Sequence, residues 1–325
     1  MKTISTKSFW IKKSNIGYIK AQKIKPPKRN QVLIKTLYSG ISYGTEKIIF
    51  NGKVPVNQVK AMKCPYQEGD FGKDVKYGYL NIGKIIKGDK KLEGKHIFSL
   101  FPHQNFYTLD KNDVITIPNN IPIKRCLLTA NMETAINATW DVMPKKGDNI
   151  FIIGAGVVGL LLGYYIKSLK GISSTIVDKD KSKRKYAKHL GLKFKNNLQK
   201  NFKANIIYEC TGDASILNNL AHHIETEGKI CILSWYGNKK SNVSFGENFF
   251  SKRLKIIFSQ VSKIPESHSK KWNLKSRRKF AIKQLFDDKL DILIEKNEIR
   301  FEELPKFFKN NINKNNFVCN IIKYE

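Results

Sequence analysis

Short apolar runs, separated by glycine, proline and charged residues, dominate the chain up to about residue 118. Short runs rich in β-branched and aromatic residues are typical of strands. The strands predicted in this region lie at residues 32–38, 79–87, 95–100, 106–109 and 114–117. The intervening segment GDKKLEGK has the composition of a turn. This part of the chain is therefore predicted to be a β-rich domain and not a series of β-α units.

From residue 123 the pattern changes to strands that alternate with helices. Helix-forming residues dominate residues 123–143, and Pro144 and Gly147 end that helix. Further strands are predicted at residues 150–153, 174–177, 205–209, 229–234 and 254–259. One helix is predicted after the glycines at 154–159, ending at residue 166. Others are predicted at 181–190, at 213–224, near 279–286 and near 302–309, and a last strand at 318–323. Strands alternating with helices predict a parallel sheet wound on both faces.

Residues 148–178 hold the most informative pattern. A short apolar strand is followed by Gly154, Gly156 and Gly159, then by an apolar helix, and a second strand closes on Asp178. The spacing G-x-G-x-x-G between a strand and a helix is typical of a dinucleotide-binding turn. The first glycine permits the tight turn, the second lets backbone approach a pyrophosphate, and the third lets the helix pack against the strand. The helix N-terminus then offers free N–H groups to the phosphates.

Asp178 bears on the choice of cofactor. Its carboxylate can accept hydrogen bonds from both adenosine ribose hydroxyls and would repel a 2′-phosphate. NAD is therefore predicted over NADP, with Lys179, Lys181 and Arg184 as the residues that would hold a 2′-phosphate if NADP were preferred. A membrane span is the other interpretation of the apolar run that begins at Ile150. The glycines that interrupt the run, and the strand that ends in an acid, exclude it.

Length and composition are those of a globular protein. A chain of 325 residues with 41% hydrophobic and 11% aromatic residues can hold two domains with sizeable cores. The first fifteen residues lack the apolar stretch of a signal peptide, so a cytoplasmic location is expected. The five cysteines contain no C-x-x-C pair, which excludes a disulfide framework and a zinc ribbon.

The net charge of +32 at pH 7 raises the question of an anionic partner. Lysines are spread along the whole chain, and no zinc finger, helix-turn-helix or RNA-binding aromatic signature accompanies them. We interpret the charge as a general bias of the composition toward lysine, and expect no nucleic-acid partner and no membrane partner. The densest basic cluster, at residues 263–279, is expected to be a solvated loop and helix start, and is the best candidate for an anionic partner.

Several segments resemble the medium-chain dehydrogenase/reductase superfamily, the zinc-type alcohol dehydrogenase-like proteins, over essentially the whole chain. SGISYGTE at residues 39–46 resembles the family segment G-I-C-G-T-D, and KYGYLNIGKI at 76–85 resembles G-H-E-x-x-G-x-V. NMETAINATWD at 131–141 falls where the family's long helix meets the active site. The first segment, with GKVP downstream, is most similar to the bacteriochlorophyllide dehydrogenase-like branch that lacks the zinc ligands.

The resemblance implies an α/β fold of two domains. A GroES-like β-rich catalytic domain is expected at residues 1–122, completed by 263–325, and a Rossmann domain with a doubly wound parallel sheet at 123–262. YECTG and ILSWYG match the ends of two strands in the family's cofactor domain. The cofactor-binding residues are then Gly154, Ala155, Gly156, Val157, Val158, Gly159, Asp178, Thr211 and Ser234. A homodimer is expected by the same resemblance.

The family's zinc ligands are missing from this sequence. The position of the family's cysteine is taken by Ser42 or Tyr43, depending on the end from which the segment is aligned, and the His-Glu pair is replaced by Tyr79 and Leu80. The chain also lacks the four cysteines of the family's structural zinc lobe. Zinc prefers thiolate, imidazole or carboxylate ligands. The sequence therefore predicts no metal site.

Without zinc, hydrogen-bond donors must polarise a carbonyl and a side chain must supply the proton. The catalytic candidates are Tyr43, Thr45, Tyr79, His103 and Glu133. The first three fall at or beside the missing ligands, and Thr45 matches the family's proton-relay hydroxyl. Each candidate has a plainer alternative: a pocket wall for the tyrosines, a hydrogen-bonded structural role for His103, and an ion pair for Glu133. Glu46 is interpreted as an orienting group.

The function predicted from these observations is a zinc-independent, NAD(P)-dependent oxidoreductase. It would transfer hydride between nicotinamide and a small alcohol or carbonyl substrate. The alternatives are a non-enzymatic dinucleotide-binding protein of the same fold, a hydroxyethyl-tetrapyrrole dehydrogenase-type enzyme, and a protein that binds nucleic acid or an anionic surface through its charge. Trp235 and Tyr236 would suit a flat or bulky substrate, whose identity the sequence does not give.

Overall fold

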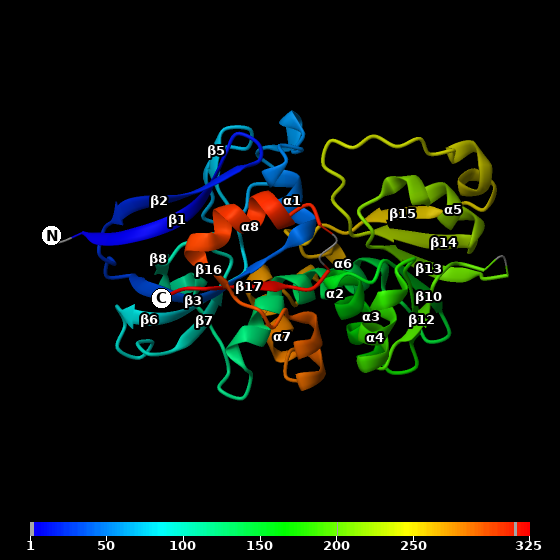
Figure 1. Cartoon of the computed structure of the whole chain (residues 1–325). Helices are drawn as coiled ribbons and strands as arrows, with labels where there is room; N and C mark the ends of the chain where they lie inside the picture. The colour runs from blue at the N-terminus through cyan, green and yellow to red at the C-terminus, as the bar shows by residue number, and fades with distance from the viewer. Residues whose placement is uncertain (1–2, 200, 315–316) are drawn as a thin grey trace. The chain divides into compact units, whose positions relative to one another are not determined.

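The chain forms a β-rich unit, passes into an α/β unit and then returns to the first (Figure 1). The computed structural model describes residues 3–199, 201–314 and 317–325. The first unit comprises Met1–Ala130 and Ile294–Glu325, and the second comprises Asn131–Leu293. Each unit is built around its own sheets and its own hydrophobic core.

Two sheets make up the described part of the first unit. The larger has seven strands in the order β16-β17-β3-β6-β7-β9, with β8 paired to β3. Its strands are β3 (Gln31–Ile41), β6 (Asn81–Lys87), β7 (His96–Ser99), β8 (Phe106–Asp110), β9 (Ile115–Thr116), β16 (Ile299–Arg300) and β17 (Asn320–Lys323). The smaller sheet, in the order β2-β1-β5-β4, consists of β1 (Ile4–Lys12), β2 (Ile16–Ile24), β4 (Glu68–Gly69) and β5 (Asp74–Lys76).

Strand β3 lies at the centre of the larger sheet. Its Val32 and Ile34 are fully buried and pack in one core with residues of β6, β7 and β8. The C-terminal strand β17 pairs antiparallel with β3, which aligns Asn320 with Ile41. The end of the chain therefore returns to the segment from which the first helix begins.

Helices of the first unit lie at strand ends. They are α1 (Tyr43–Phe50), α8 (Leu304–Asn311) and 3-10 turns at Val56–Gln58, Lys111–Asp113, Ile123–Leu128 and Phe301–Glu303. Helix α8 is fixed by Phe308, which is fully buried and lies against the rings of Phe9 and Phe50 at centroid distances of 4.7 and 5.4 Å. This aromatic contact connects α8 to β1 and to α1.

The second unit holds one parallel sheet in the order β12-β11-β10-β13-β14-β15. The strands are β10 (Asn149–Ile153), β11 (Ser173–Val177), β12 (Lys193–Lys195), β13 (Ala204–Glu209), β14 (Ile224–Ile232) and β15 (Lys255–Phe258). The helices are α2 (Thr129–Val142), α3 (Val157–Ser168), α4 (Arg184–His189), α5 (Leu217–His222), α6 (Glu266–Ser269) and α7 (Leu274–Lys283). Shorter helical turns lie at Lys181–Lys183, Ala214–Ile216, Phe245–Phe249 and Asp288–Leu293.

Helices cover both faces of this sheet, because successive side chains of β10 point to opposite faces and contact different helices. Phe151 and Ile153 share a core with Leu217 of α5, whereas Ile152 packs against Gly163 of α3. The strand order reverses at β10, which pairs with β11 on one side and β13 on the other. In such sheets, ligands bind outside the carboxyl ends of the strands where the order reverses. The predicted doubly wound parallel sheet is confirmed.

The division between the units differs from the predicted one at residues 263–293, which were expected to complete the β-rich domain. They pack within the second unit because Arg277 of α7 is buried, with its Nε 3.2 Å from Oε1 of Glu133 in α2. Its guanidinium also donates to the carbonyl of Val261 at 2.5 Å. The predicted helix start is present as a capping box of Asn273 and Ser276. One arginine of the basic run thus points inward, where a solvated segment was expected.

Several elements of the first unit were not predicted, among them the short strands β4, β5 and β16. The hairpin of β1 and β2 was missed because β2 has no buried residue, and its two lysines, Lys20 and Lys23, interrupt the apolar pattern. Helix α1 was missed because its sequence, YGTEKIIF, was interpreted through the family resemblance alone. Across the described residues, no helix has both the length and the apolar character needed to cross a membrane.

Candidate functional site

The glycine turn joins β10 to α3 with the geometry that its sequence demands. Gly154 has φ of +106°, and a Cβ there would lie 2.8 Å from the carbonyl oxygen of Cys210. A Cβ on Gly159 would lie 2.0 Å from the carbonyl oxygen of Gly154, so only glycine lets the helix start so close to the turn. Both positions therefore require glycine for backbone reasons.

Gly156 has a different task, because a Cβ there would meet nothing within 4 Å. It is the N-cap of α3 and no side chain caps the helix. The first N–H groups of an α-helix, here including those of Val157 and Val158, have no partner within the helix. The turn therefore presents unpaired donors and the positive end of a helix dipole to open space, which suits a pyrophosphate.

Asp178 ties the turn to the end of β11. Its Oδ2 accepts a hydrogen bond from the N–H of Ala155 at 2.7 Å, and its Oδ1 accepts from the N–H of Asp180 at 2.9 Å. Lys183 Nζ lies 2.8 Å from Oδ2, and the Asp178 side chain is 8% exposed. The carboxylate keeps lone pairs for a ribose hydroxyl, but Lys183 offsets its charge. Lys183 was not among the cations considered from the sequence.

Thr211 and Ser234 follow β13 and β14 at the same edge of the sheet. Thr211 donates from N–H and Oγ1 to Oε1 of Glu209, each at 2.5 Å, and Ser234 Oγ accepts from the N–H of Gly212 at 2.9 Å. Glu209 is fully buried and also accepts from the Tyr236 hydroxyl at 2.7 Å. Burial, and then the Glu209 charge, raise the pKa of Tyr236. Sequence reasoning missed Glu209, although an acid ending an apolar strand was a visible signal.

In the first unit, Ser42, Thr45 and Tyr79 form a hydroxyl cluster. The Tyr79 hydroxyl lies 2.5 Å from Ser42 Oγ and 3.2 Å from Thr45 Oγ1. Burial raises the pKa of Tyr79 to about 12, so the phenol stays protonated at neutral pH. Two of the five catalytic candidates are thus brought together, with Ser42 as the third member.

A buried polar chain runs behind the hydroxyl cluster through Glu46, His103, Ser39 and Tyr324. The N–H of Ser42 donates to Glu46 Oε1 at 2.7 Å, and Glu46 Oε2 lies 2.9 Å from His103 Nε2. His103 Nδ1 lies 2.8 Å from Ser39 Oγ, which lies 2.8 Å from the Tyr324 hydroxyl. His103 is 1% exposed, so this geometry matches the hydrogen-bonded structural alternative.

The remaining candidates lie elsewhere. Tyr43 begins α1, and its hydroxyl donates to Oδ1 of Asn320 in β17 at 2.9 Å. Glu133 belongs to the second unit, where Arg277 Nε lies 3.2 Å and Arg278 Nε 2.8 Å from its carboxylate oxygens. Its side chain is 2% exposed, which matches the ion-paired alternative.

The side chains at the family's zinc positions do not fit zinc. Ser42 and Tyr79 offer protonated hydroxyls, and Leu80 is fully buried in the core. Burial raises the pKa of the nearby Cys64 thiol to about 12, which disfavours the thiolate that zinc requires. Within residues 3–199, 201–314 and 317–325, no group of three His, Cys, Asp or Glu side chains is placed to hold a metal ion. No reaction step is therefore derived through a metal.

No protein-family model matches the chain. Over 206 residues it is 27% identical to an "Uncharacterized zinc-type alcohol dehydrogenase-like protein" of Haemophilus influenzae, covering 59% of this chain and 55% of the relative. The chain thus spans about half the length of that curated relative.

Solved structures of dehydrogenases share the fold over nearly the whole chain. L-idonate 5-dehydrogenase of Escherichia coli K-12 superposes with a TM-score of 0.79 at 14% identity, covering 99% of both chains. A short chain alcohol dehydrogenase of E. coli CFT073 complexed with NADH gives 0.75 at 16%, covering 98% of this chain and 99% of its own. Staphylococcus aureus TarJ in complex with NADPH gives 0.73 at 14%, covering 99% and 100%. At these identities the likeness concerns the fold, and it confirms the predicted fold class.

Proposed function

We propose that this chain is a member of the medium-chain dehydrogenase/reductase superfamily and a zinc-independent, NAD(P)-dependent oxidoreductase acting on an alcohol/carbonyl pair. The bacteriochlorophyllide dehydrogenase-like branch stays a prediction. The observation that carries the proposal is the glycine turn at the start of α3, with open space in front of Gly156 and an acid bonded to the turn. This arrangement suits the pyrophosphate of a dinucleotide.

The second unit would hold the cofactor. Val157 and Val158 would donate backbone N–H groups to the phosphates, and Asp178 would accept from the adenosine ribose. Thr211 and Ser234 would line the carboxyl edge of the sheet beside the turn. A bound nicotinamide would supply the hydride acceptor or donor. Fold neighbours hold NADH or NADPH, and we propose NAD here because Asp178 keeps a free lone pair, although Lys183 reduces its repulsion of a 2′-phosphate.

The first unit would supply hydrogen-bond donors in place of the Lewis acid that zinc provides elsewhere in the superfamily. Burial raises the pKa of Tyr79 to about 12, so its phenol stays protonated at neutral pH and can donate a hydrogen bond. Ser42 and Thr45 lie within hydrogen-bond distance of its hydroxyl and would carry the proton onward. The buried polar chain fixes Ser42 through the bond from its N–H to Glu46. Preorganised donors of this kind stabilise a developing alkoxide.

A non-enzymatic dinucleotide-binding protein is the second candidate. It is favoured by the burial of His103 and by the double ion pair of Glu133, which remove two candidates from direct chemistry. The hydroxyl cluster argues for the enzyme, because it gathers three hydroxyls, at or beside the positions expected for metal ligands, within hydrogen-bond distance of Tyr79.

Nucleotide titration followed by a substrate screen tests the proposal. NADH binding would be measured by nicotinamide fluorescence, and hydride transfer to aldehydes, ketones and quinones by absorbance at the nicotinamide band. Gly156→Val should abolish binding in a folded protein, because its side chain would enter the space in front of the turn. Normal NADH affinity in this variant would contradict the assignment of the turn. Binding without turnover on any carbonyl would favour the non-enzymatic candidate.

A further inference from the structure

A depression with a volume of about 450 Å³ lies at the end of the larger sheet where β3 begins. Three segments line it: the loop from β2 to β3, the turn from β6 to β7, and the start of the 3-10 turn after β8. The segment GDKKLEGK, predicted as a turn, supplies one of these walls. Five of the nine lining residues are cations and one is an acid: Lys28, Arg29, Lys87, Lys90 and Lys111, with Glu93.

The pairing of the strands brings these three segments together. Strand β3 runs antiparallel to both β6 and β8, so its first residues lie beside the last residues of both. Gly88 has φ of +137°, and a Cβ there would lie 2.8 Å from the carbonyl oxygen of Gln31. The N–H of Lys111 donates to the carbonyl of Asn30 at 2.9 Å. Backbone contacts therefore hold the cation-bearing segments against one another.

Most of these cations have no acid beside them. Lys111 is paired with Asp89 at 3.2 Å, and the one lining acid, Glu93, accepts from the N–H of Gly88 at 3.0 Å. Among the described residues, no carboxylate lies within ion-pair distance of the other four cations, which are all exposed: Lys28, Arg29, Lys87 and Lys90. Like charges gathered in this way repel one another. A bound anion would relieve that repulsion.

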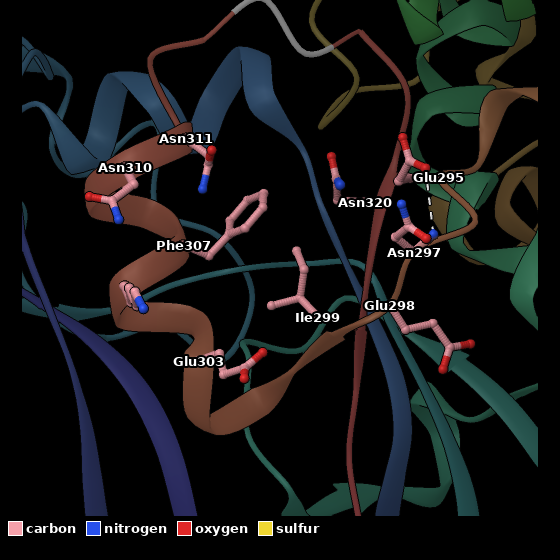
Figure 2. A pocket seen from close by; sticks show the side chains of 10 residues that line it. Glu295, Asn297, Glu298, Ile299, Glu303, Phe307, Asn310, Asn311 and Asn320 are labelled. Carbon is pink, nitrogen blue, oxygen red and sulfur yellow. Dashed lines mark hydrogen bonds between the residues drawn. The ribbon is translucent and has the colours of Figure 1, made fainter.

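The net charge of the chain does not by itself account for this lining. The pocket beside α8 (Figure 2) is lined by three glutamates and a single cation, Lys306. In the densest basic cluster of the sequence, at residues 263–279, Arg277 is buried and Arg278 is paired with Glu133. A basic lining is therefore a property of this depression, and not of every pocket in the chain.

We infer that this depression binds a small polyanion that carries two or more phosphate groups. Four unpaired cations match several negative charges better than one, and the guanidinium of Arg29 can hold a phosphate with two hydrogen bonds. Among the described residues that line the depression, Pro27 alone is apolar and none is aromatic, so charge and not stacking would select the ligand. The volume falls in the range of small-molecule sites. The inference is independent of the dehydrogenase proposal, because no residue of the second unit takes part in it.

Titration calorimetry with inorganic triphosphate, at an ionic strength of about 0.15 M and without divalent cations, tests this site. The titrations use the Gly156→Val background, so that the glycine turn of the second unit does not compete for the anion. Triphosphate should bind at one site per chain, and about tenfold more tightly than inorganic phosphate. The double variant Arg29→Gln, Lys90→Gln should weaken triphosphate binding by about tenfold. The double variant Lys270→Gln, Lys271→Gln makes the same charge change at exposed residues of the second unit, and should alter the affinity by less than about twofold.

Thermal unfolding provides a second readout. Without ligand, Arg29→Gln, Lys90→Gln should unfold at the temperature of its parent or above it, because the substitutions remove repulsion between cations. Triphosphate should raise the unfolding temperature of the parent more than that of this variant.

The inference is overturned if triphosphate does not bind, or if Arg29→Gln, Lys90→Gln binds it with parental affinity. It is also overturned if both double variants lose affinity equally, because net charge would then explain the binding. A short oligothymidylate that depends on Arg29 and Lys90, and binds much more tightly than triphosphate, would assign the surface to nucleic acid and would likewise overturn the inference.

Discussion

Tyr79 illustrates how a single residue changes the chemistry available at a fixed position of a fold. The resemblance to the superfamily places it at the position expected for a zinc ligand, and its hydroxyl lies within hydrogen-bond distance of those of Ser42 and Thr45. Burial keeps the phenol protonated by raising its pKa to about 12. The side chain can therefore donate a hydrogen bond without any metal.

Tyr79→Phe removes this donor and keeps the ring. We expect kcat to fall by about 10²–10³-fold, because one preorganised donor to a developing oxyanion has that effect. The NADH dissociation constant should change little, since the cofactor is assigned to the second unit. Steady-state kinetics and fluorescence titration measure the two quantities. An unchanged kcat would show that Tyr79 only shapes the pocket wall.

Asp178 is a second residue whose role the structure has refined. Asp178→Ala should weaken NADH binding by about 2–4 kcal/mol, through the loss of hydrogen bonds to a charged acceptor. It should also remove the negative charge that lies 2.8 Å from Lys183 and would repel a 2′-phosphate, and so raise the affinity for NADPH relative to NADH. Parallel titrations of both nucleotides measure this ratio. Lys183→Ala is the matched control, and should lower NADPH affinity in the Asp178→Ala background.

At the scale of elements, α7 and α2 are joined by a buried ionic contact. Arg277 lies 3.2 Å and Arg278 2.8 Å from the Glu133 carboxylate, and Arg277 also donates to Asn137. Burial lowers the pKa of Arg277, and the Glu133 charge opposes that shift. Removing one partner of such a pair leaves an uncompensated buried charge.

Glu133→Gln should therefore destabilise the protein by about 3–5 kcal/mol. Chemical denaturation measures this loss, and Arg278→Gln, which removes the more exposed partner, should cost less. If Glu133 instead took part in the reaction, Glu133→Gln would reduce turnover while the free energy of unfolding stayed the same.

The elements differ in how far the sequence could predict them. Five strands of the parallel sheet and the glycine turn were predicted, because β-branched runs and the need for glycine at Gly154 and Gly159 are local properties. The short edge strand β12, whose sequence is KFK, was not predicted. The inward position of Arg277 was not predicted. Its burial is favourable only because it contacts Glu133 of α2, which lies 144 residues away in the sequence. The buried polar chain was missed for the same reason: Ser39 and Tyr324 are brought together only by the pairing of β17 with β3.

For the whole molecule, the edge of the parallel sheet suggests how two copies would meet. Strand β15 is the last strand of the sheet, and Phe258 at its end is 70% exposed. Phe250 and Phe245, which precede the strand, are 81% and 58% exposed. Unpaired edges with exposed apolar side chains favour association with another chain. We propose this edge as the place where two copies would associate in the homodimer expected from the resemblance.

Phe258→Glu should shift a dimer towards monomer, because it places a charge on this edge. Size-exclusion chromatography with light scattering measures the mass, and Phe286→Glu, at another exposed phenylalanine (65%), is the control. A wild-type monomer, or a Phe258→Glu protein that stays dimeric, would contradict this interface.

The central claim is hydride transfer without zinc by a protein of a zinc-dehydrogenase fold. It rests on Ser42, Tyr79 and Leu80 at the positions of the metal ligands, and on the absence, among the described residues, of a metal-ligating cluster. Elemental analysis of protein purified without a histidine tag, combined with the carbonyl assay before and after a chelator, tests it most directly. The account predicts no stoichiometric zinc and undiminished turnover after chelation. Near-stoichiometric zinc, with turnover lost to the chelator, would contradict it.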